Sequence, residues 1–428
     1  MKKKIWIVLF MLTAAASFIM AGAGEEKAGE GKTVVHFFHR WPQEPRFSYY
    51  NQIVADFEKQ NPNIKIEMDS VLNDSYKEKI RVLVSSNDIP DVFVSWSDSF
   101  AYNLVQSGRI KVLNEMLAKD KAFADTLIKP QIQPFTFNNN IYGLPFTIDG
   151  KVFVYNREIF SKAGITKAPA SFTELLNILE TLKKAGHETP ILEGLQDTWT
   201  IAHYQGTIFQ RILPRDVLER DFTEKTGEFT HAGYKQGMER FQQLVTYMGP
   251  NATSLDHTTV RNLFIAGRLP LMYIQLAEFG YIQADNPSLD YGIFNFPAIE
   301  GGAGDPSYLT GAPEGFMMSN TSKAPEAAEL LYKFLYSTPN AEKFVKDVRA
   351  PVGIIGAVNA NNSYPKLMEA IDLIMETKAY PWFDNAVNIK IADAFMRGAQ
   401  SVATGDKTVD QVLAEVRAAA QVVRSEAK

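Results

Sequence analysis

Apolar and polar residues follow two different periods in the first hundred residues of the chain. Val34–Phe38 is an apolar, β-rich run that predicts a first strand. Helical spacing then appears in a set of aromatic and apolar residues, namely Phe47, Tyr50, Val54 and Phe57. Further short strands are predicted at Ile64–Met68 and Pro90–Val94, with a helix between them. Strands that alternate with helices predict an α/β fold with a mostly parallel sheet.

The stretch Tyr142–Phe160 joins two parts of the chain. Gly143 and Pro145 are turn residues, and the polar residues Asp149–Lys151 interrupt the apolar pattern. A helix is expected to begin at Asn156. Such a joint suits a chain that crosses from one lobe to another. An ordinary strand, turn and strand inside one domain has the same local pattern, so both interpretations stay open here.

Helix signals continue after this joint. Ser171 with Glu174, and Thr408 with Gln411, have the spacing of capping boxes. Pro325 stands where a first-turn proline opens a helix. Helices are therefore expected to begin at these three places, and short strands are predicted at Pro190–Leu192, Leu271–Ile274 and Tyr291–Phe296.

The composition is that of an ordinary globular protein. The chain has 428 residues, of which 46% are hydrophobic and 22% charged, so its length suggests two or three compact units. The formal net charge is −5. This acidic balance argues against a nucleic-acid partner, which would require basic patches.

The first residues have the pattern of a secretory signal peptide. Lys2–Lys4 form a basic segment, Ile5–Met20 an apolar segment, and Ala21–Ala23 a small-residue cleavage site, which predicts cleavage after Ala23. An uncleaved membrane anchor is the alternative, although the apolar run is short for a membrane span. Residues 24–32 read as a flexible lead-in. We therefore expect a periplasmic or extracellular protein.

The chain contains no cysteine. It is therefore expected to fold without disulfides, and it has no residue to acylate as bacterial lipoproteins do. How such a protein would be retained at the membrane is left open.

Four tryptophans follow the leader, and each lies in a polar loop or at the end of a predicted element: Trp41, Trp96, Trp199 and Trp382. Polar neighbours accompany all of them, namely Arg40 and Glu44, Ser95 and Asp98, Asp197, and Asp384 with Asn385. Any one tryptophan is more often a core residue than a ligand platform. Indole faces beside carboxylates and amides nevertheless suit a neutral carbohydrate, whose rings have apolar faces and hydroxyl edges.

Other chemistries have weaker support in the sequence. The six histidines lack the spacing of metal ligands, and no G-x-S-x-G motif is present. We expect neither a metal nor another cofactor. A pair of carboxylates for glycoside hydrolysis stays possible, because two acidic residues can come from any part of a fold.

Several segments together resemble the extracellular solute-binding proteins of bacterial ABC sugar importers, the family that includes maltose-binding protein. The resemblance rests on these segments: FEKQNPNIKIE at Phe57–Glu67, PDVF at Pro90–Phe93, IYGLPFTIDGKVFVYNREIFSKAGI at Ile141–Ile165, FIAGRLPLMY at Phe264–Tyr273, and TGDKTVDQVLAEV at Thr404–Val416. They cover nearly the whole chain after the leader, in the family's order.

The resemblance implies a type II periplasmic-binding-protein fold, in which two α/β lobes close on a ligand like a Venus flytrap. The implied lobes are residues 33–149 plus 293–338, and residues 150–292 plus 339–428. The three crossings of the cleft would then lie near Asp149–Val152, Asp290–Ile293 and Ser337–Asn340.

The resemblance also implies a set of ligand-binding residues. Carried onto this sequence, they are Trp41, Glu44, Trp96, Asp98, Asp149, Trp199, Gln275, Glu314, Trp382 and Asn388. The flanking segments match best at Asp98 and Asp149.

The expected function is that of a non-catalytic monomer that captures a sugar or oligosaccharide and delivers it to an ABC transporter permease. A secreted glycoside hydrolase is one alternative. A solute-binding protein for another solute, or for a sensor system, is the other.

Overall fold

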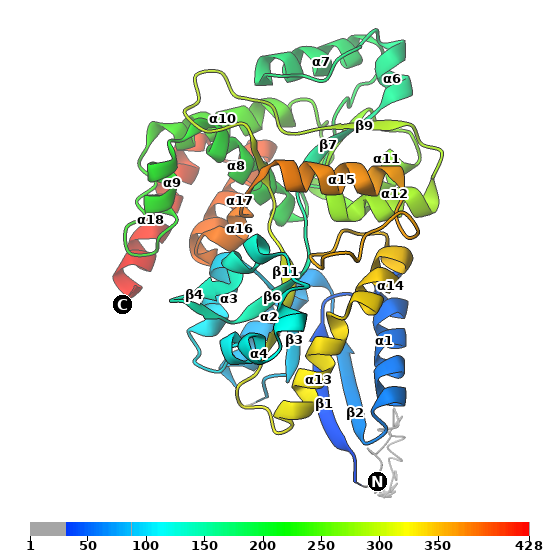
Figure 1. Ribbon diagram of the computed structural model, residues 1–428. Helices are drawn as coiled ribbons and strands as arrows, with labels where there is room; N and C mark the ends of the chain where they lie inside the picture. Colours follow the sequence, from blue (N-terminus) through cyan, green and yellow to red (C-terminus); the bar gives the residue numbers. More distant parts are fainter. Residues whose placement is uncertain (1–30, 87, 428) are drawn as a thin grey trace, which may run out of the picture.

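The computed structural model describes residues 31–86 and 88–427. The predicted signal peptide, its cleavage site and most of the lead-in therefore lie outside the described residues. The two larger sheets of the described chain occupy separate halves of the molecule, and each half has its own hydrophobic core (Figure 1). None of the helices in the described part of the chain is long and apolar enough to cross a bilayer.

The first sheet has five strands in the order β2-β1-β3-β11-β6. β1 (Thr33–His39) pairs in parallel with both β2 (Ile64–Ser70) and β3 (Val92–Trp96), as the alternation of strands and helices predicts. β11 (Glu314–Met318) is inserted antiparallel between β3 and β6 (Gly143–Thr147). A segment about two hundred residues away in sequence thus completes the sheet.

The helices around this sheet bury apolar faces on it, and α1 (Arg46–Gln60) does so through Tyr49, Tyr50, Ile53 and Phe57. The remaining elements of this half are α2 (Asn73–Ser85), α3 (Asp98–Val105), α4 (Asn114–Lys119), α5 (Lys121–Ala124), η1 (Lys129–Phe135), β4 (Thr136–Phe137), β5 (Asn140–Ile141), α13 (Pro325–Leu335) and α14 (Thr338–Val348).

The second sheet has three strands in the order β8-β7-β9. β7 (Lys151–Asn156) pairs antiparallel with both β8 (Leu271–Gln275) and β9 (Tyr291–Phe294). The strand and helix alternation that predicts parallel pairing in the first hundred residues therefore does not extend to this sheet, whose two strand pairs are both antiparallel. The strand expected near Ile191 is reduced to a single parallel bridge with Leu271.

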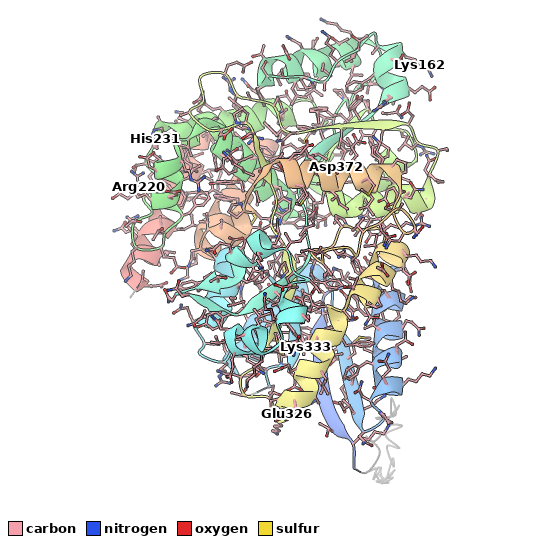
Figure 2. The ribbon with its side chains drawn as sticks, in the orientation of Figure 1. Lys162, Arg220, His231, Glu326, Lys333 and Asp372 are labelled. Carbon is pink, nitrogen blue, oxygen red and sulfur yellow. The ribbon has the colours of Figure 1, made fainter. Side chains whose placement is uncertain are left out.

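Helices dominate the second half. Its remaining elements are α6 (Arg157–Lys162), α7 (Phe172–Lys184), α8 (Thr198–Ile212), α9 (Arg215–Asp221), α10 (Ala232–Val245), η2 (Ala252–Ser254), α11 (His257–Ile265), η3 (Leu276–Glu278), α12 (Phe279–Asp285), β10 (Tyr308–Thr310), α15 (Pro365–Glu376), β12 (Lys378–Tyr380), α16 (Phe383–Ala386), α17 (Ile389–Thr404) and α18 (Val409–Glu426). The exposed residues Lys162 on α6 and Glu326 on α13 mark opposite ends of the molecule (Figure 2).

The predicted capping boxes form to different extents. Thr408 and Gln411 make both hydrogen bonds of the box at the start of α18. Ser171 accepts a hydrogen bond from the backbone N–H of Glu174, but the Glu174 carboxylate bonds the N–H of Ala170 instead. Local sequence therefore specifies both helix starts, with one contact rearranged.

The chain passes between the two cores at three places. The first lies between Thr147, which ends β6, and Lys151, which begins β7. The second comes after β10, since Leu309 packs in the second core and β11 begins at Glu314 in the first sheet. The third falls within α15, since Leu367 still packs in the first core and Ala370 packs in the second.

Two of these crossings come later than the sequence-based boundaries at 292/293 and 338/339. β9 stays in the second half because it pairs with β7, and its Phe294 stacks on Phe153 with ring centroids 5.1 Å apart. α14 stays in the first half because Phe344 packs edge-on against Tyr49 and Phe146, both at 5.0 Å. Each segment stays in the lobe that precedes the expected boundary because its aromatic ring packs into the core of that lobe.

Gly315 provides a test of the packing in the first sheet. A Cβ atom at this position would lie 1.7 Å from the carbonyl oxygen of Leu144 on β6, where the ladder has a bulge. We expect Gly315→Ala to lower the free energy of unfolding by about 3 kcal/mol, since the strands must move apart. Urea denaturation measures this change. Gly353→Ala is the matched control, because its added Cβ would meet no atom closer than 3.4 Å. Equal effects of the two substitutions would contradict the prediction.

Candidate functional site

A cavity of about 540 Å³ lies between the two cores. Its walls come from both halves of the chain. Trp41 and Trp96 lie at the carboxyl ends of the neighbouring parallel strands β1 and β3, and Trp199 and Trp382 lie on the opposite wall. Parallel strands place their carboxyl ends at one edge of a sheet, which is where ligands bind in α/β folds.

The structure brings seven of the ten predicted site residues to this cavity. They are Trp41, Trp96, Asp149, Trp199, Gln275, Glu314 and Trp382. They come from loops and strand ends far apart in the sequence. Their role in ligand binding stays a prediction.

Glu44, Asp98 and Asn388 do not line this cavity. Glu44 lies at the exposed start of α1, where its carboxylate accepts a hydrogen bond from the Ser48 hydroxyl at 2.7 Å. Asn388 caps α17 and donates to the Glu224 carboxylate at 2.6 Å. Asp98 begins α3 and lines a second cavity, to which Trp96 does not contribute. Local helix geometry therefore directs these three side chains elsewhere.

Three of the four tryptophans are buried, and other groups cover their ring faces. Trp41 stacks on Tyr50 at 5.2 Å, with planes 9° apart. Trp96 has the guanidinium of Arg40 at 4.9 Å and the ammonium of Lys77 at 4.8 Å from its ring centroid. These contacts are cation–π interactions, which hold the cations at the cavity wall. The indole faces expected to be open are therefore partly occupied.

The second wall has one buried and one more accessible tryptophan. Trp382 stacks on His203 at 4.1 Å, with planes 24° apart. Trp199 is half-buried, and the ammonium of Lys151 lies 5.1 Å from its ring centroid. Trp199 is thus the most exposed of the four cavity-lining tryptophans.

Ion pairs hold the cations of the first wall. Arg40 binds the carboxylate of Glu314 and donates to the amide oxygen of Asn73 at 3.0 Å. Lys77 on α2 binds Asp384 on α16 at 2.8 Å, and both side chains are largely buried. Because α2 and α16 belong to different halves, the second pair joins the two walls directly.

Asp149 lies on the first crossing between the cores. Its carboxylate accepts hydrogen bonds from the backbone N–H groups of Gly150 at 2.8 Å and Ala277 at 3.0 Å. The side-chain amide of Gln275 donates to its second oxygen at 3.0 Å. Burial raises the pKa of Asp149 to about 7, although the backbone hydrogen bonds act in the opposite direction. The carboxyl group therefore changes charge near neutral pH.

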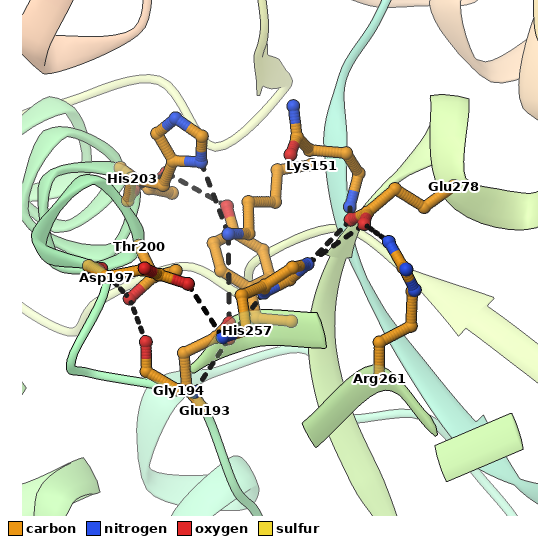
Figure 3. Close-up of polar contacts among 12 residues, drawn as sticks. Lys151, Glu193, Gly194, Asp197, Thr200, His203, His257, Arg261 and Glu278 are labelled. Carbon is orange, nitrogen blue, oxygen red and sulfur yellow. Dashed lines mark hydrogen bonds and ion pairs between the residues drawn. The ribbon is translucent and has the colours of Figure 1, made fainter. Parts of the chain in front are cut away.

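A buried polar network lies beneath the second wall (Figure 3). The ammonium of Lys151 is fully buried, 3.2 Å from Nδ1 of His203 and 3.7 Å from the carboxylate of Glu193. His257 bridges two carboxylates, since its Nδ1 lies 2.8 Å from Glu193 and its Nε2 lies 2.8 Å from Glu278. The network thus runs from the first residue of β7 to the surface of the cavity.

Burial and charge set the protonation states in this network. Burial alone lowers the pKa of His257, but the carboxylates of Glu278 and Glu193 outweigh it and raise the pKa to about 9. His203 shows the opposite result, since burial and the charge of Lys151 hold its pKa well below its ordinary value. His257 is therefore a cation and His203 a neutral ring at pH 7, so Nδ1 of His203 can accept a hydrogen bond from the Lys151 ammonium.

Sequence reasoning missed several polar residues at this site. Lys77, His203, His257 and Glu278 gave no local signal, because each is a single ionisable residue within an ordinary element. Lys151 stood out only as part of the polar break Asp149–Lys151. Their partners come from distant segments, and only the fold brings them together. Other lining residues stood beside the tryptophans in the sequence, namely Arg40, Asp197, Asp384 and Asn385. Proximity to a tryptophan in the sequence was therefore the signal that could have identified these four residues.

The chain belongs to the family of bacterial extracellular solute-binding proteins, whose profile matches residues 41–342. It is similar to a multiple sugar-binding protein of Streptococcus mutans, with 22% identity over 419 residues that cover 88% of each chain.

Solved structures share the fold. A chitin oligosaccharide binding protein superimposes with a TM-score of 0.83 at 22% identity, covering 92% of this chain and 99% of the other. A solute-binding protein in complex with raffinose gives a TM-score of 0.73 at 18% identity, covering 92% and 100%. The predicted two-lobed, mixed α/β fold and the suspected family are confirmed.

The charge on His257 predicts how stability depends on pH. Its folded-state pKa of about 9 lies above the ordinary value of 6.5, so the stabilisation is complete below pH 6.5 and is lost as the pH rises through about 9. The shift corresponds to about 3 kcal/mol. We expect urea denaturation to show this loss in the parent protein, and a much smaller loss over the same range in His257→Gln.

His36→Gln is the control for this experiment, because His36 is exposed and lies away from the cleft. It should leave the pH dependence of the parent unchanged. A parent protein whose stability stays flat between pH 6.5 and 9 would contradict the assignment of a charged His257.

Proposed function

We propose that this protein captures a sugar or oligosaccharide outside the cytoplasmic membrane and delivers it to an ABC transporter permease. The observation that carries the proposal is the cavity between the two cores, which combines the half-buried Trp199 with carboxylate and amide groups from both walls. Its volume of about 540 Å³ suits a small saccharide. The names of the relatives, which include sugar-binding and chitin oligosaccharide binding proteins, support the same class of ligand.

The chemistry of the walls explains how a sugar would be held. The exposed part of the Trp199 ring would pack against the apolar C–H face of a sugar ring. Asp149 and Gln275 lie together at the hinge side of the cavity and offer acceptors and a donor to hydroxyl groups. Both walls contact a ligand only when the lobes are closed, so binding shifts the population towards the closed form.

Protein groups also favour closure. The ion pair between Lys77 and Asp384 and the hydrogen bond from the Ser99 hydroxyl to the carbonyl of Ala386, at 2.7 Å, both cross between the lobes. A ligand therefore adds to a closed state that the protein already supports. The permease would recognise this state.

The family is one of solute-binding proteins, and we propose that this member has no catalytic activity. Glu278 supports the proposal, because His257 and Arg261 outweigh the effect of burial and lower its pKa, so that it stays ionised and is a poor general acid. We further propose a secreted monomer whose signal peptide is cleaved after Ala23. Incubation with an oligosaccharide mixture tests the hydrolase alternative, since a binding protein leaves the sugars unchanged.

Isothermal titration across a carbohydrate panel tests the proposed function. We expect at least one sugar to bind, and Trp199→Ala to weaken that binding about tenfold, because the stacking surface is lost. The thermal midpoint should stay within about 3 °C of the parent, since Trp199 is only half-buried. Phe47→Ala, at an exposed position on α1, is the control and should bind as the parent does. Heat from peptides, polyamines or anions alone would refute the sugar assignment.

The charge of Asp149 predicts a pH dependence of binding. With a pKa of about 7, the carboxylate is mostly protonated at pH 6 and mostly ionised at pH 8. If the ionised group accepts sugar hydroxyls, affinity rises by up to about tenfold over this range. Asp149→Asn should bind more weakly at pH 8 and lose this rise. An unchanged affinity and pH profile in the variant would show that Asp149 serves only the hinge.

A further inference from the structure

A second cavity of about 360 Å³ lies beside the first, also between the two lobes. Two chain segments line both cavities. In the first lobe, Trp96 lines the first cavity and Asp98 lines the second. In the second lobe, Asn385 lines the first cavity and Ala386 lines the second. The second cavity is therefore a continuation of the same cleft.

The boundary between the cavities consists of contacts between the lobes. The ion pair of Lys77 with Asp384 and the hydrogen bond from Ser99 to Ala386 lie where the two lining segments pass from one cavity to the other. Both contacts are made between opposite lobes, so both are broken when the cleft opens. A ligand that spans both cavities therefore enters while the lobes are apart, and in the closed form its own contacts to the two lobes replace these two contacts.

Aromatic rings from both lobes line the second cavity: Tyr102, Phe137, Phe222, Tyr308 and Tyr380. None of them is fully buried. In the first lobe Tyr102 and Phe137 lie 5.3 Å apart, and in the second lobe Tyr380 lies edge-on to Tyr308 at 6.1 Å. Partly exposed aromatic faces with hydroxyl groups at their edges suit stacking on sugar rings.

Asp98 adds a polar group to this cavity. Its carboxylate accepts a hydrogen bond from the Ser97 hydroxyl at 2.7 Å, and its other oxygen has no hydrogen-bond partner among the described residues. Asp98 has a φ of 59°, in the left-handed backbone region that residues other than glycine rarely adopt. Backbone strain of this kind gathers at functional sites. The free oxygen is an acceptor for a hydroxyl group.

We infer that the second cavity is a binding site for the further sugar units of an oligosaccharide whose first units occupy the larger cavity. This inference rests on the proposed function and adds the length of the ligand to it. Tyr102 stacks on the added units from the first lobe and Tyr380 from the second, while Asp98 accepts a hydroxyl hydrogen bond. A longer chain therefore contributes contacts to both lobes at a second place and stabilises the closed form further.

The test is the dependence of affinity on chain length. Xylo-, cello-, malto- and manno-oligosaccharides of two to six units are titrated into the parent, Tyr102→Ala and Tyr380→Ala. In the series that binds, we expect affinity for the parent to rise about tenfold or more from the shortest to the longest ligand. Both variants should lose most of this rise and bind the shortest ligand as the parent does.

Trp199→Ala is the contrasting variant, since it should weaken short and long ligands alike. Tyr102 is 38% exposed, so Tyr102→Ala is expected to fold and keeps the test valid even if Tyr380→Ala does not. An affinity that is independent of length, or a tyrosine variant that weakens all lengths equally or none, would overturn the inference and leave the proposed function standing. The absence of heat from every carbohydrate in the parent would instead refute the proposed function itself.

Discussion

A buried ammonium group at the start of β7 constrains the structure around the cleft. Lys151 has no solvent contact, and an unpaired charge in such a place costs several kcal/mol, on the order of the stability of many proteins. Glu193 supplies a counter-charge, His203 accepts a hydrogen bond, and Trp199 presents its ring face. Because Lys151 directly follows the first crossing, these partners tie the wall of the cavity to the hinge.

The remaining charges of the cleft follow the same rule of local compensation. Arg40 pairs with Glu314 and Lys77 pairs with Asp384, while His257 bridges Glu193 to the cavity wall. The cleft is therefore strongly polar without a large excess of one charge. Such a surface favours a ligand with many hydroxyl groups over an ion, because the fixed charges already have partners and act mainly as hydrogen-bonding groups.

Much of the site could be predicted because it lies at the ends of regular elements. Trp41 and Trp96 follow apolar runs that are visible as strands, and parallel pairing brings their ends together. Asp98 shows where this reasoning fails. It stands two residues after Trp96, yet its φ of 59° and its place at the start of α3 direct it to the second cavity. A left-handed residue at a helix start has no sequence signature beyond the tolerance of aspartate for that conformation.

Patterns of adjacent residues specify the strands and helices of the first lobe, the helix caps and the class of the fold, because periodic burial and capping depend on neighbours a few positions apart. The positions of the second and third crossings depend on long-range packing instead. β9 is held by Phe153, and α14 by Tyr49 and Phe146, through aromatic contacts that no local pattern records. The buried partners of Lys151 belong to the same category, since the energy of a buried charge depends on groups that only the folded chain brings within a few ångströms.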